Sequence, residues 1–193
     1  MSSTVLYMSM SLDGFIAGPD EDPGRLHEWV FPGAENGDYK AAVARLKGVN
    51  RQIYDEFMAT GAVVAGRGTF EPAAGWDGDH HDGVPIYVLS RNRAPAWAAD
   101  WPLVHYVGNL AAAIRDSKTA AGDKNVLVHG AGIVQRALKE GLIDELEIHL
   151  VPVLFGEGRR LFEHLGAKAR ELERIRVLEG EGGVTHLRYR VRR

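Results

Sequence analysis

The chain has 193 residues, of which 45% are hydrophobic and 25% are charged, and its formal net charge is -3. These values fit a globular protein with one domain spanning residues 1–193, and they exclude an intrinsically disordered chain. The small negative charge gives no electrostatic reason to expect nucleic acid or an acidic membrane as a partner, and the lack of cysteine excludes disulfides, thiolate metal sites and cysteine nucleophiles.

The N-terminal segment is predicted to contain a strand. Residues 5–10 form a short apolar run rich in strand-forming residues, and Asp13-Gly14 marks a turn behind it. The first three residues lack the basic start of a signal peptide, and no run of ~18 apolar residues follows anywhere in the chain. We therefore expect a protein without a membrane segment, located in the cytoplasm.

A long loop and a helix are predicted next. Residues 18–38 carry three prolines and several glycines, and the apolar cluster around Trp29 favours a loop that packs on the protein. Over residues 39–58 the apolar side chains recur at steps of three and four, which predicts one helix. Gly61 follows as a C-cap residue.

The middle of the sequence alternates strands with helices. The predicted strands are 62–65, 85–89, 103–107 and 126–129, and the predicted helices are 110–120 and 133–139. A further strand, 146–154, contains Pro152, where we expect a bend or an edge position. Residues 173–178 and 184–191 predict an antiparallel hairpin around a glycine-rich turn.

This order of elements predicts an α/β fold with a mainly parallel central sheet, helices on both faces and a C-terminal antiparallel hairpin. Ligands of such sheets bind at the carboxyl ends of the strands. We therefore expect the functional site in the segments that follow residues 10, 65, 89 and 129.

The turn Gly130-Ala131-Gly132 joins a predicted strand to a helix and suits an anion, because small residues let backbone N–H groups approach it and the helix N-terminus adds a partial positive charge. It matches the dinucleotide fingerprint only in part, since Gln135 replaces the third glycine and no acid follows the next strand. A standard Rossmann site is thereby disfavoured. The alternative interpretation is an ordinary tight turn.

A second turn, Gly66-Arg67-Gly68-Thr69, places a guanidinium at another strand end, and Ser90-Arg91 does the same after the following strand. The planar fork of arginine suits phosphate oxygens. Two arginines without a ribose-binding acid favour a 2′-phosphate, and hence NADP rather than NAD. The alternative is that these arginines only solubilise surface loops.

Five motifs in order carry a family resemblance. They are SMSLDGFIA at 9–17, GRGTF at 66–70, VLSR at 88–91, HGAG at 129–132, and IDEL at 143–146 leading to PVLFGEG at 152–158. With them the chain resembles the reductase domain of the bacterial riboflavin-biosynthesis deaminase/reductase and its stand-alone dihydrofolate-reductase-like relatives. The resemblance covers nearly the whole chain.

The resemblance implies a dihydrofolate-reductase-like fold, NADPH as hydride donor and a homodimer. It also implies the cofactor-binding residues, which are Ser9, Ile16 and Ala17 along the nicotinamide and its ribose, Gly66, Arg67 and Thr69 on the pyrophosphate and adenosine side, Ser90 and Arg91 at the 2′-phosphate, and Gly130, Ala131 and Gly132 behind the nicotinamide and pyrophosphate. Dihydrofolate reductases proper carry two adjacent glycines at this last turn, where Ala131 intervenes here.

The proton donor is harder to assign. The related enzymes use a carboxylate on the helix before the second strand, which suggests Asp55, although counting back from Gly66 leads nearer Asn50. A solvated position on the helix surface is the competing interpretation of Asp55. Asp13 is interpreted as a turn residue.

Other residues receive structural or secondary interpretations. Trp29 is a candidate substrate contact, because its loop would border the pocket. His129 is either a donor near the cofactor or a core histidine. The segment 77–82 contains metal-ligand types without a ligand spacing, and we predict a mobile solvent loop and no metal site. Trp76, Trp97 and Trp101 are expected to serve packing.

The predicted function is an NADPH-dependent reductase of a small heterocyclic substrate. The resemblance points to 5-amino-6-(5-phosphoribosylamino)uracil in riboflavin synthesis or to dihydrofolate or a pterin. The deaminase step would require zinc-binding cysteines, which the chain lacks. The alternative is a non-catalytic protein that binds or senses NADP. The segment 148–155 fits either a dimer interface or a core strand.

Overall fold

The computed structural model describes residues 2–34 and 37–192. Its helices are α1 (Tyr39–Ala44), α2 (Gly48–Met58), α3 (Arg67–Phe70), α4 (Leu110–Ala121) and α5 (Ala131–Lys139). Its strands are β1 (Thr4–Ser11), β2 (Phe15–Ala17), β3 (Ala62–Gly66), β4 (Ile86–Leu89), β5 (Val104–Val107), β6 (Val126–His129), β7 (Glu145–Val151), β8 (Arg159–Arg160), β9 (Leu172–Glu179) and β10 (Thr185–Val191).

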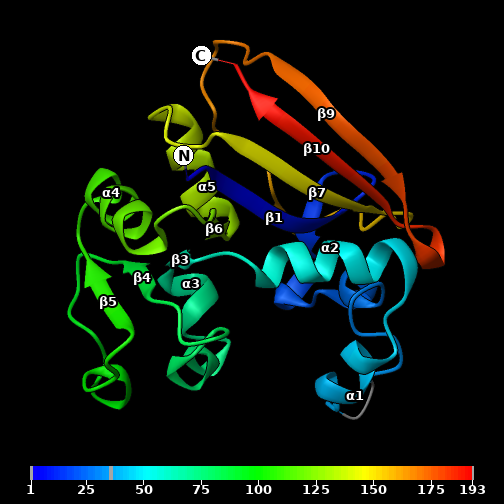
Figure 1. The fold of residues 1–193 in the computed structure, drawn as a ribbon. Coiled ribbons are helices and arrows are strands. Elements are labelled where there is room, and N and C mark those ends of the chain that lie inside the picture. Colours follow the sequence, from blue (N-terminus) through cyan, green and yellow to red (C-terminus); the bar gives the residue numbers. More distant parts are fainter. Residues whose placement is uncertain (1, 35–36, 193) are drawn as a thin grey trace.

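Within the described residues the main sheet has eight strands in the order β5-β4-β3-β6-β1-β7-β10-β9, and β2 pairs with β8 in a small second sheet. The strands from β5 to β7 run parallel, whereas β10 is antiparallel to both β7 and β9 (Figure 1). The predicted α/β fold with a mainly parallel sheet and a C-terminal hairpin is confirmed.

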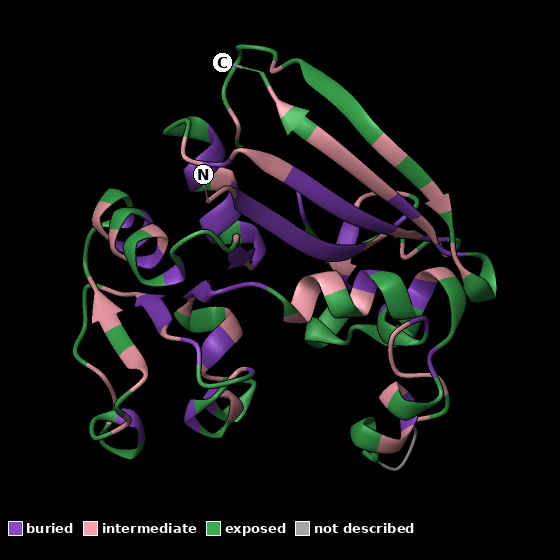
Figure 2. Ribbon diagram, viewed as in Figure 1, coloured by how far each residue is buried: buried purple, intermediate pink, exposed green. Residues whose placement is uncertain are grey.

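Helices cover both faces of the sheet, as predicted. Because side chains alternate along a strand, Leu6 and Met8 of β1 pack in the cluster that α4 and α5 complete. Val5 and Tyr7 face the other way and pack with α3 and with Phe57 of α2. Burial is concentrated in β1, β3 and β6, while β9 is exposed along much of its length (Figure 2).

The predicted single helix over 39–58 is wrong, because the chain breaks between α1 and α2. Gly48 has φ +52°, and a side chain there would collide with the Glu181 carboxylate. That carboxylate comes from the turn between β9 and β10 and accepts a hydrogen bond from the backbone N–H of Asn50 at 3.2 Å. Glu181, which lies far from α2 in the sequence, thus accepts a hydrogen bond from a backbone N–H at the start of α2 that has no partner within the helix.

Two loops are more ordered than their composition indicates. The 18–38 loop contains short 3-10 turns at Pro19–Glu21 and Gly24–His27 and buries Leu26 and Trp29, which agrees with the prediction that it packs on the protein. The prediction of a solvent loop at 77–82 is wrong at His81. This ring is 5% exposed, and its Nε2 lies 3.1 Å from the carbonyl oxygen of Thr60.

The segment 148–155 lies mainly in the core of the chain. β7 ends at Val151, before Pro152, and Ile148 and Val151 are buried, whereas Leu154 is 68% exposed. Trp76 and Trp101 pack around Phe70, and Trp97 stacks on the same ring, as expected. In the stretches 2–34 and 37–192 we find no helix long and apolar enough to cross a membrane.

Candidate functional site

The two glycine turns lie side by side at the carboxyl edge of the sheet. β3 pairs with β6 so that Ala65 is opposite His129, and the turns begin at the next residues, Gly66 and Gly130. β4 lies on the other side of β3, with Leu89 opposite Gly66, so Ser90 follows at the same edge. The fold therefore brings three of the four predicted cofactor segments together at this edge.

The contact between the turns leaves no room for a side chain. Gly130 has φ +100°, and a Cβ there would lie 2.3 Å from Oγ1 of Thr69; a Cβ on Gly66 would lie 3.2 Å from Cγ1 of Ile133. Gly132, by contrast, is exposed in the first turn of α5 with nothing within 4 Å of its Cβ position. The exposed N-terminus of α5, which lies beside the glycine backbone of the Gly66 turn, fits the pyrophosphate of a dinucleotide.

The predicted phosphate arginines differ in their surroundings. Arg67 makes two hydrogen bonds to Glu71, of 2.7 and 3.0 Å, and the Tyr106 hydroxyl donates to the same carboxylate at 3.4 Å. These bonds hold the pKa of Glu71 below its usual range. Arg91 is exposed beside a turn in which Ser90 Oγ accepts from the N–H of Asn92 at 2.9 Å.

A short arm made of β2 and β8 carries Ile16 and Ala17. Gly158 (φ +132°) permits this pairing, because a Cβ there would lie 2.1 Å from the carbonyl oxygen of Ala17. Arg159 forms an ion pair with Glu21 at 2.7 Å across the arm.

Asp13 fastens the arm to the loop after β7. Its carboxylate accepts hydrogen bonds from Ser11 Oγ at 2.5 Å, from the N–H of Gly156 at 2.7 Å and from the N–H of Phe155 at 3.2 Å. The Ser11 hydroxyl and these backbone N–H groups lower the pKa of Asp13 to about 2. Its role goes beyond the turn residue expected from Asp13-Gly14.

Next to β1, a buried polar cluster extends toward the other side of the site. Ser9 accepts a hydrogen bond from the indole N–H of Trp29 at 2.8 Å. The Trp29 ring centroid lies 4.4 Å from that of His149 and 4.8 Å from that of His186. Asn50 completes the cluster through its side-chain oxygen, 3.1 Å from Nε2 of His186.

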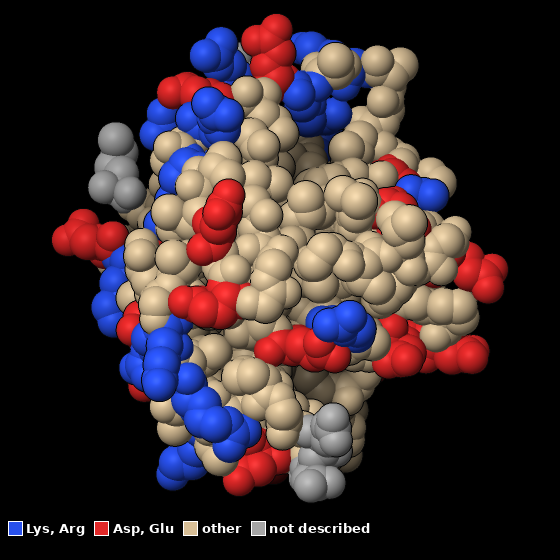
Figure 3. Space-filling view, turned by 90° about the vertical axis from the view of Figure 1, so that its right-hand side faces the viewer, with Lys and Arg blue, Asp and Glu red and all other residues tan. Residues whose placement is uncertain are grey.

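A cavity of about 920 Å³ adjoins this cluster. Trp29 and Asn50 contribute to its wall, together with residues from the 23–34 loop, α1, the end of β7 and the β9–β10 turn. Figure 3 views the molecule from the side of α1 and that turn, and acidic and basic side chains interleave around a centre that carries few charges. The volume suits a small organic molecule.

The candidate proton donor Asp55 lies outside this site. Its side chain is 55% exposed and pairs with Arg51 one helical turn earlier, at 2.8 Å. Asp55 does not contribute to the cavity wall, whereas Asn50, on the same helix, does. The geometry supports the alternative interpretation of Asp55 as a solvated residue on the helix surface.

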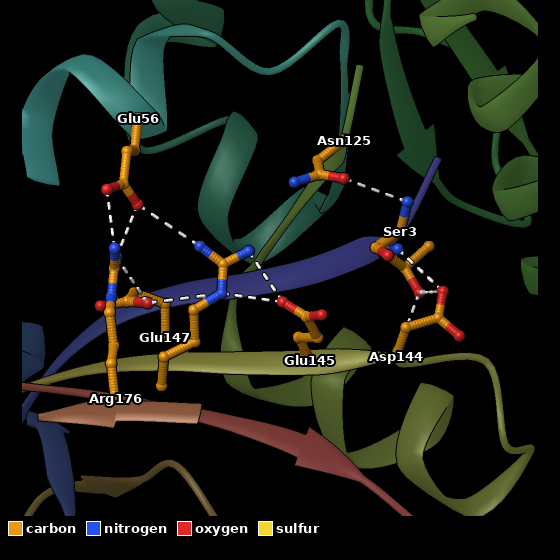
Figure 4. Close-up of polar contacts among 9 residues, drawn as sticks. Ser3, Glu56, Asn125, Asp144, Glu145, Glu147 and Arg176 are labelled. Carbon is orange, nitrogen blue, oxygen red and sulfur yellow. Dashed lines mark hydrogen bonds and ion pairs between the residues drawn. The ribbon is translucent and has the colours of Figure 1, made fainter. Parts of the chain in front are cut away.

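A buried ionic network, which the sequence did not indicate, fixes α2 to the sheet. Glu147 of β7 is fully buried, and Glu56 of α2 reaches toward Arg176 of β9, which contacts both carboxylates (Figure 4). Arg188 of β10 pairs with Glu145 at 2.8 Å. Burial raises the pKa of Glu147 despite these arginines, and it raises the pKa of the neighbouring Tyr7 to about 12.

The histidines of this region are held neutral by burial. The pKa of His186 is lowered to about 4, that of His129 to about 4, and that of His149 well below its usual value. The sequence did not indicate His149 and His186 as site residues. Each is a polar residue at an inward-facing position of an otherwise apolar strand, and which positions face inward is known only once the strand pairing is known. The described residues contain no group of three or more acids and histidines arranged for a metal ion.

The parallel sheet extended by a terminal hairpin, with paired glycine turns at its carboxyl edge, defines an α/β protein of the dihydrofolate-reductase-like fold. Residues 3–185 match the family model of the RibD C-terminal domain. The chain therefore belongs to the RibD C-terminal domain family.

Solved structures agree with this placement. A protein from Shewanella sp. PV-4 assigned to riboflavin biosynthesis is 26% identical, with a TM-score of 0.76 over 99% of both chains. A pyrimidine reductase-like protein from Corynebacterium diphtheriae is 13% identical, with a TM-score of 0.69 over 100% of this chain and 92% of its own.

A longer relative shares the fold over part of its length. The diaminohydroxyphosphoribosylaminopyrimidine deaminase/5-amino-6-(5-phosphoribosylamino)uracil reductase from Thermotoga maritima is 13% identical, with a TM-score of 0.67, and the match covers 99% of this chain but 57% of the relative. No curated protein matches the sequence significantly.

Proposed function

We propose that the protein is an NADPH-dependent reductase of a small heterocyclic substrate, resembling the reductase of 5-amino-6-(5-phosphoribosylamino)uracil. The observation that carries this proposal is the contact between the turns at Gly66 and Gly130, on adjacent strands, with Ser90 at the same edge. Membership of the RibD C-terminal domain family supports an oxidoreductase.

In this proposal the open N-terminus of α5 at Gly132 and the backbone of Gly66 hold the pyrophosphate. Thr69 of the first turn lies against Gly130 of the second. Arg91, exposed beside Ser90, would meet the 2′-phosphate. The arm strand with Ile16 and Ala17 borders the nicotinamide. When bound, NADPH supplies the hydride.

The substrate would lie beyond the nicotinamide, between Ser9 and the cavity behind Trp29. Asp55 is not retained as the proton donor. Because the buried histidines are neutral near pH 7, we propose that the proton comes from solvent.

The experiment measures NADPH binding by fluorescence and its consumption by absorbance, with the aminouracil intermediate and with dihydrofolate. We expect binding of NADPH in preference to NADH, and turnover of one of the two substrates. Tight binding without turnover of either substrate would instead support the non-catalytic NADP-binding or sensing protein. Lack of NADPH binding would contradict both functions.

The homodimer stays a proposal as well. The support is that Leu172, Ile175 and Val177 of the edge strand β9 are each at least 40% exposed, which is unusual for apolar side chains that no partner covers. Sedimentation velocity would test it, and a monomer at micromolar concentration would contradict it.

A further inference from the structure

His149 belongs to a chain of polar contacts that ends at backbone groups. Its Nδ1 lies 2.9 Å from Nδ1 of His186, and Nε2 of His186 lies 3.1 Å from the side-chain oxygen of Asn50. The amide nitrogen of Asn50 donates to the carbonyl oxygens of Trp29 and Glu181, each at 3.1 Å. The side chains of His149, His186 and Asn50 are all buried.

The carbonyl contacts fix where the protons are. Because Nδ2 of Asn50 faces two carbonyl oxygens, the amide cannot be flipped without placing oxygen against oxygen. Its Oδ1 therefore accepts from Nε2–H of His186. A neutral His186 then accepts at Nδ1, so His149 donates through Nδ1–H and keeps a lone pair on Nε2.

This lone pair is directed away from the hairpin. Nδ1 of His149 faces His186 on β10, and Nε2, on the opposite edge of the ring, makes no hydrogen bond within the described residues. On β1 the residue opposite His149 is Ser9, and Trp29 covers both. The imidazole of His149 therefore lies beside Ser9, a predicted nicotinamide contact, and beside Trp29, which contributes to the cavity wall.

A second imidazole lies on the other side of β1. His129 ends β6 on the same face as Tyr7. Its Nδ1 is buried without a hydrogen-bond partner within the described part of the chain. A buried polar atom without a partner indicates a missing one.

We propose that His149 determines substrate specificity by accepting, through Nε2, a hydrogen bond from an N–H group of the substrate heterocycle, and that Asn50 and His186 are positioning residues that fix its accepting tautomer. This inference rests on the proposed reductase function. The group that His149 selects is therefore a hydrogen-bond donor on an uncharged ring.

The tautomer is tested without any ligand, by NMR of the full chain labelled with ¹⁵N-histidine. We expect Nε2 of His149 to be unprotonated at neutral pH in the wild type and in Asp55→Asn, a control on the exposed surface of the same helix. Asn50→Ala removes the acceptor for His186 and should give a mixture of both tautomers. A proton on Nε2 of His149 in the wild type would overturn the proposal.

Substrate recognition is tested by equilibrium binding of 5-amino-6-(5-phosphoribosylamino)uracil to the complex with NADP⁺. His149→Leu should weaken this binding on the order of tenfold, whereas His149→Gln, whose amide oxygen can replace the lone pair, should recover most of the affinity. NADP⁺ affinity should be unchanged in both variants.

The binding results distinguish failure of the His149 inference from failure of the proposed reductase function. If the wild type binds the pyrimidine and His149→Leu binds it equally well, this inference is wrong and the reductase function stands. If the wild type binds neither NADPH nor the pyrimidine, the proposed function fails, and the substrate role of His149 fails with it.

Discussion

The hydroxyl of Thr69 occupies the position where a side chain on Gly130 would begin, since a Cβ there would lie 2.3 Å from Oγ1. The two residues are far apart in the sequence and belong to different turns. Their contact joins the turns into one surface at the carboxyl ends of β3 and β6. This surface is the basis of the proposed cofactor site.

Adding a methyl group to Gly130 or to Gly132 of this surface should therefore affect stability and NADPH binding differently. Gly130→Ala meets Thr69 and a φ of +100°, so we expect the free energy of unfolding to fall by about 2 kcal/mol or more. Gly132→Ala, in the open first turn of α5, should keep or slightly raise stability but weaken NADPH binding by blocking phosphate approach. Thermal unfolding and fluorescence titration measure the two effects; undiminished NADPH affinity of Gly132→Ala would remove this turn from the site.

The two candidate phosphate arginines should contribute unequally. Arg67 is held by Glu71 through two hydrogen bonds, whereas Arg91 is exposed beside Ser90. We expect Arg91→Ala to reduce the preference for NADPH over NADH about tenfold, which corresponds to one charge-assisted hydrogen bond, and Arg67→Ala to reduce it less. Arg115→Ala, on the exposed surface of α4, is the control. A preference that survives in the double variant of Arg67 and Arg91 would show that the phosphate lies elsewhere.

Replacing Asp13 should loosen the arm that carries Ile16 and Ala17. Asp13→Asn loses an acceptor for Gly156 N–H and Phe155 N–H, so hydrogen exchange at these two amides should accelerate while the central sheet stays protected. Asp20→Asn, at an exposed position with φ 59° that asparagine tolerates, is the matched control. Because the folded pKa of Asp13 is about 2 against an ordinary 3.8, its contribution should be complete above pH 3.8 and lost as the pH falls through 2. Unchanged hydrogen exchange at the Gly156 amide would contradict the proposal that Asp13 holds the arm to the loop after β7.

The buried network beneath α2 should be sensitive to the loss of one charge. Arg176→Met leaves the fully buried Glu147 without its nearest cation, which should lower the free energy of unfolding by roughly 3–5 kcal/mol. Adding Glu147→Leu should recover part of this loss. Arg136→Met breaks an exposed pair with Glu140 and should change stability by less than ~1 kcal/mol. Equal effects of Arg176→Met and Arg136→Met in urea denaturation would show that burial of the network does not matter.

Stability should fall in mild acid because of the buried histidines. The unfolded chain takes up a proton at His186 from about pH 6.5 downward, whereas the folded protein resists it until about pH 4. The unfolded state therefore binds more protons in this window, and stability should decrease by roughly 1.4 kcal/mol per pH unit for such a group. His186→Gln should flatten the slope measured by denaturation between these pH values, while His164→Asn, at an exposed residue, should not. An unchanged slope in His186→Gln would mean that His186 is already protonated in the fold.

The sequence by itself determined the fold class, the hairpin and the segments that form the edge of the sheet proposed to bind the cofactor. Apolar runs ending in glycine turns specify parallel strands locally, and parallel strands necessarily bring their carboxyl ends to one edge. The sequence alone therefore predicts that Gly66, Ser90 and Gly130 lie at the same edge. The five ordered motifs indicated the family correctly. These features depend on neighbours in the chain or on a general rule of sheets.

Only the tertiary structure decided which side chains form the other half of the site. The break before α2 depends on Glu181, a residue that sequence periodicity over 39–58 does not include. The exposure of Asp55 and the burial of Asn50 depend on how α2 is rotated against the sheet, and the His149–His186 pair depends on the register between β7 and β10. Long-range register and helix rotation follow from packing the whole core, and local patterns do not contain them.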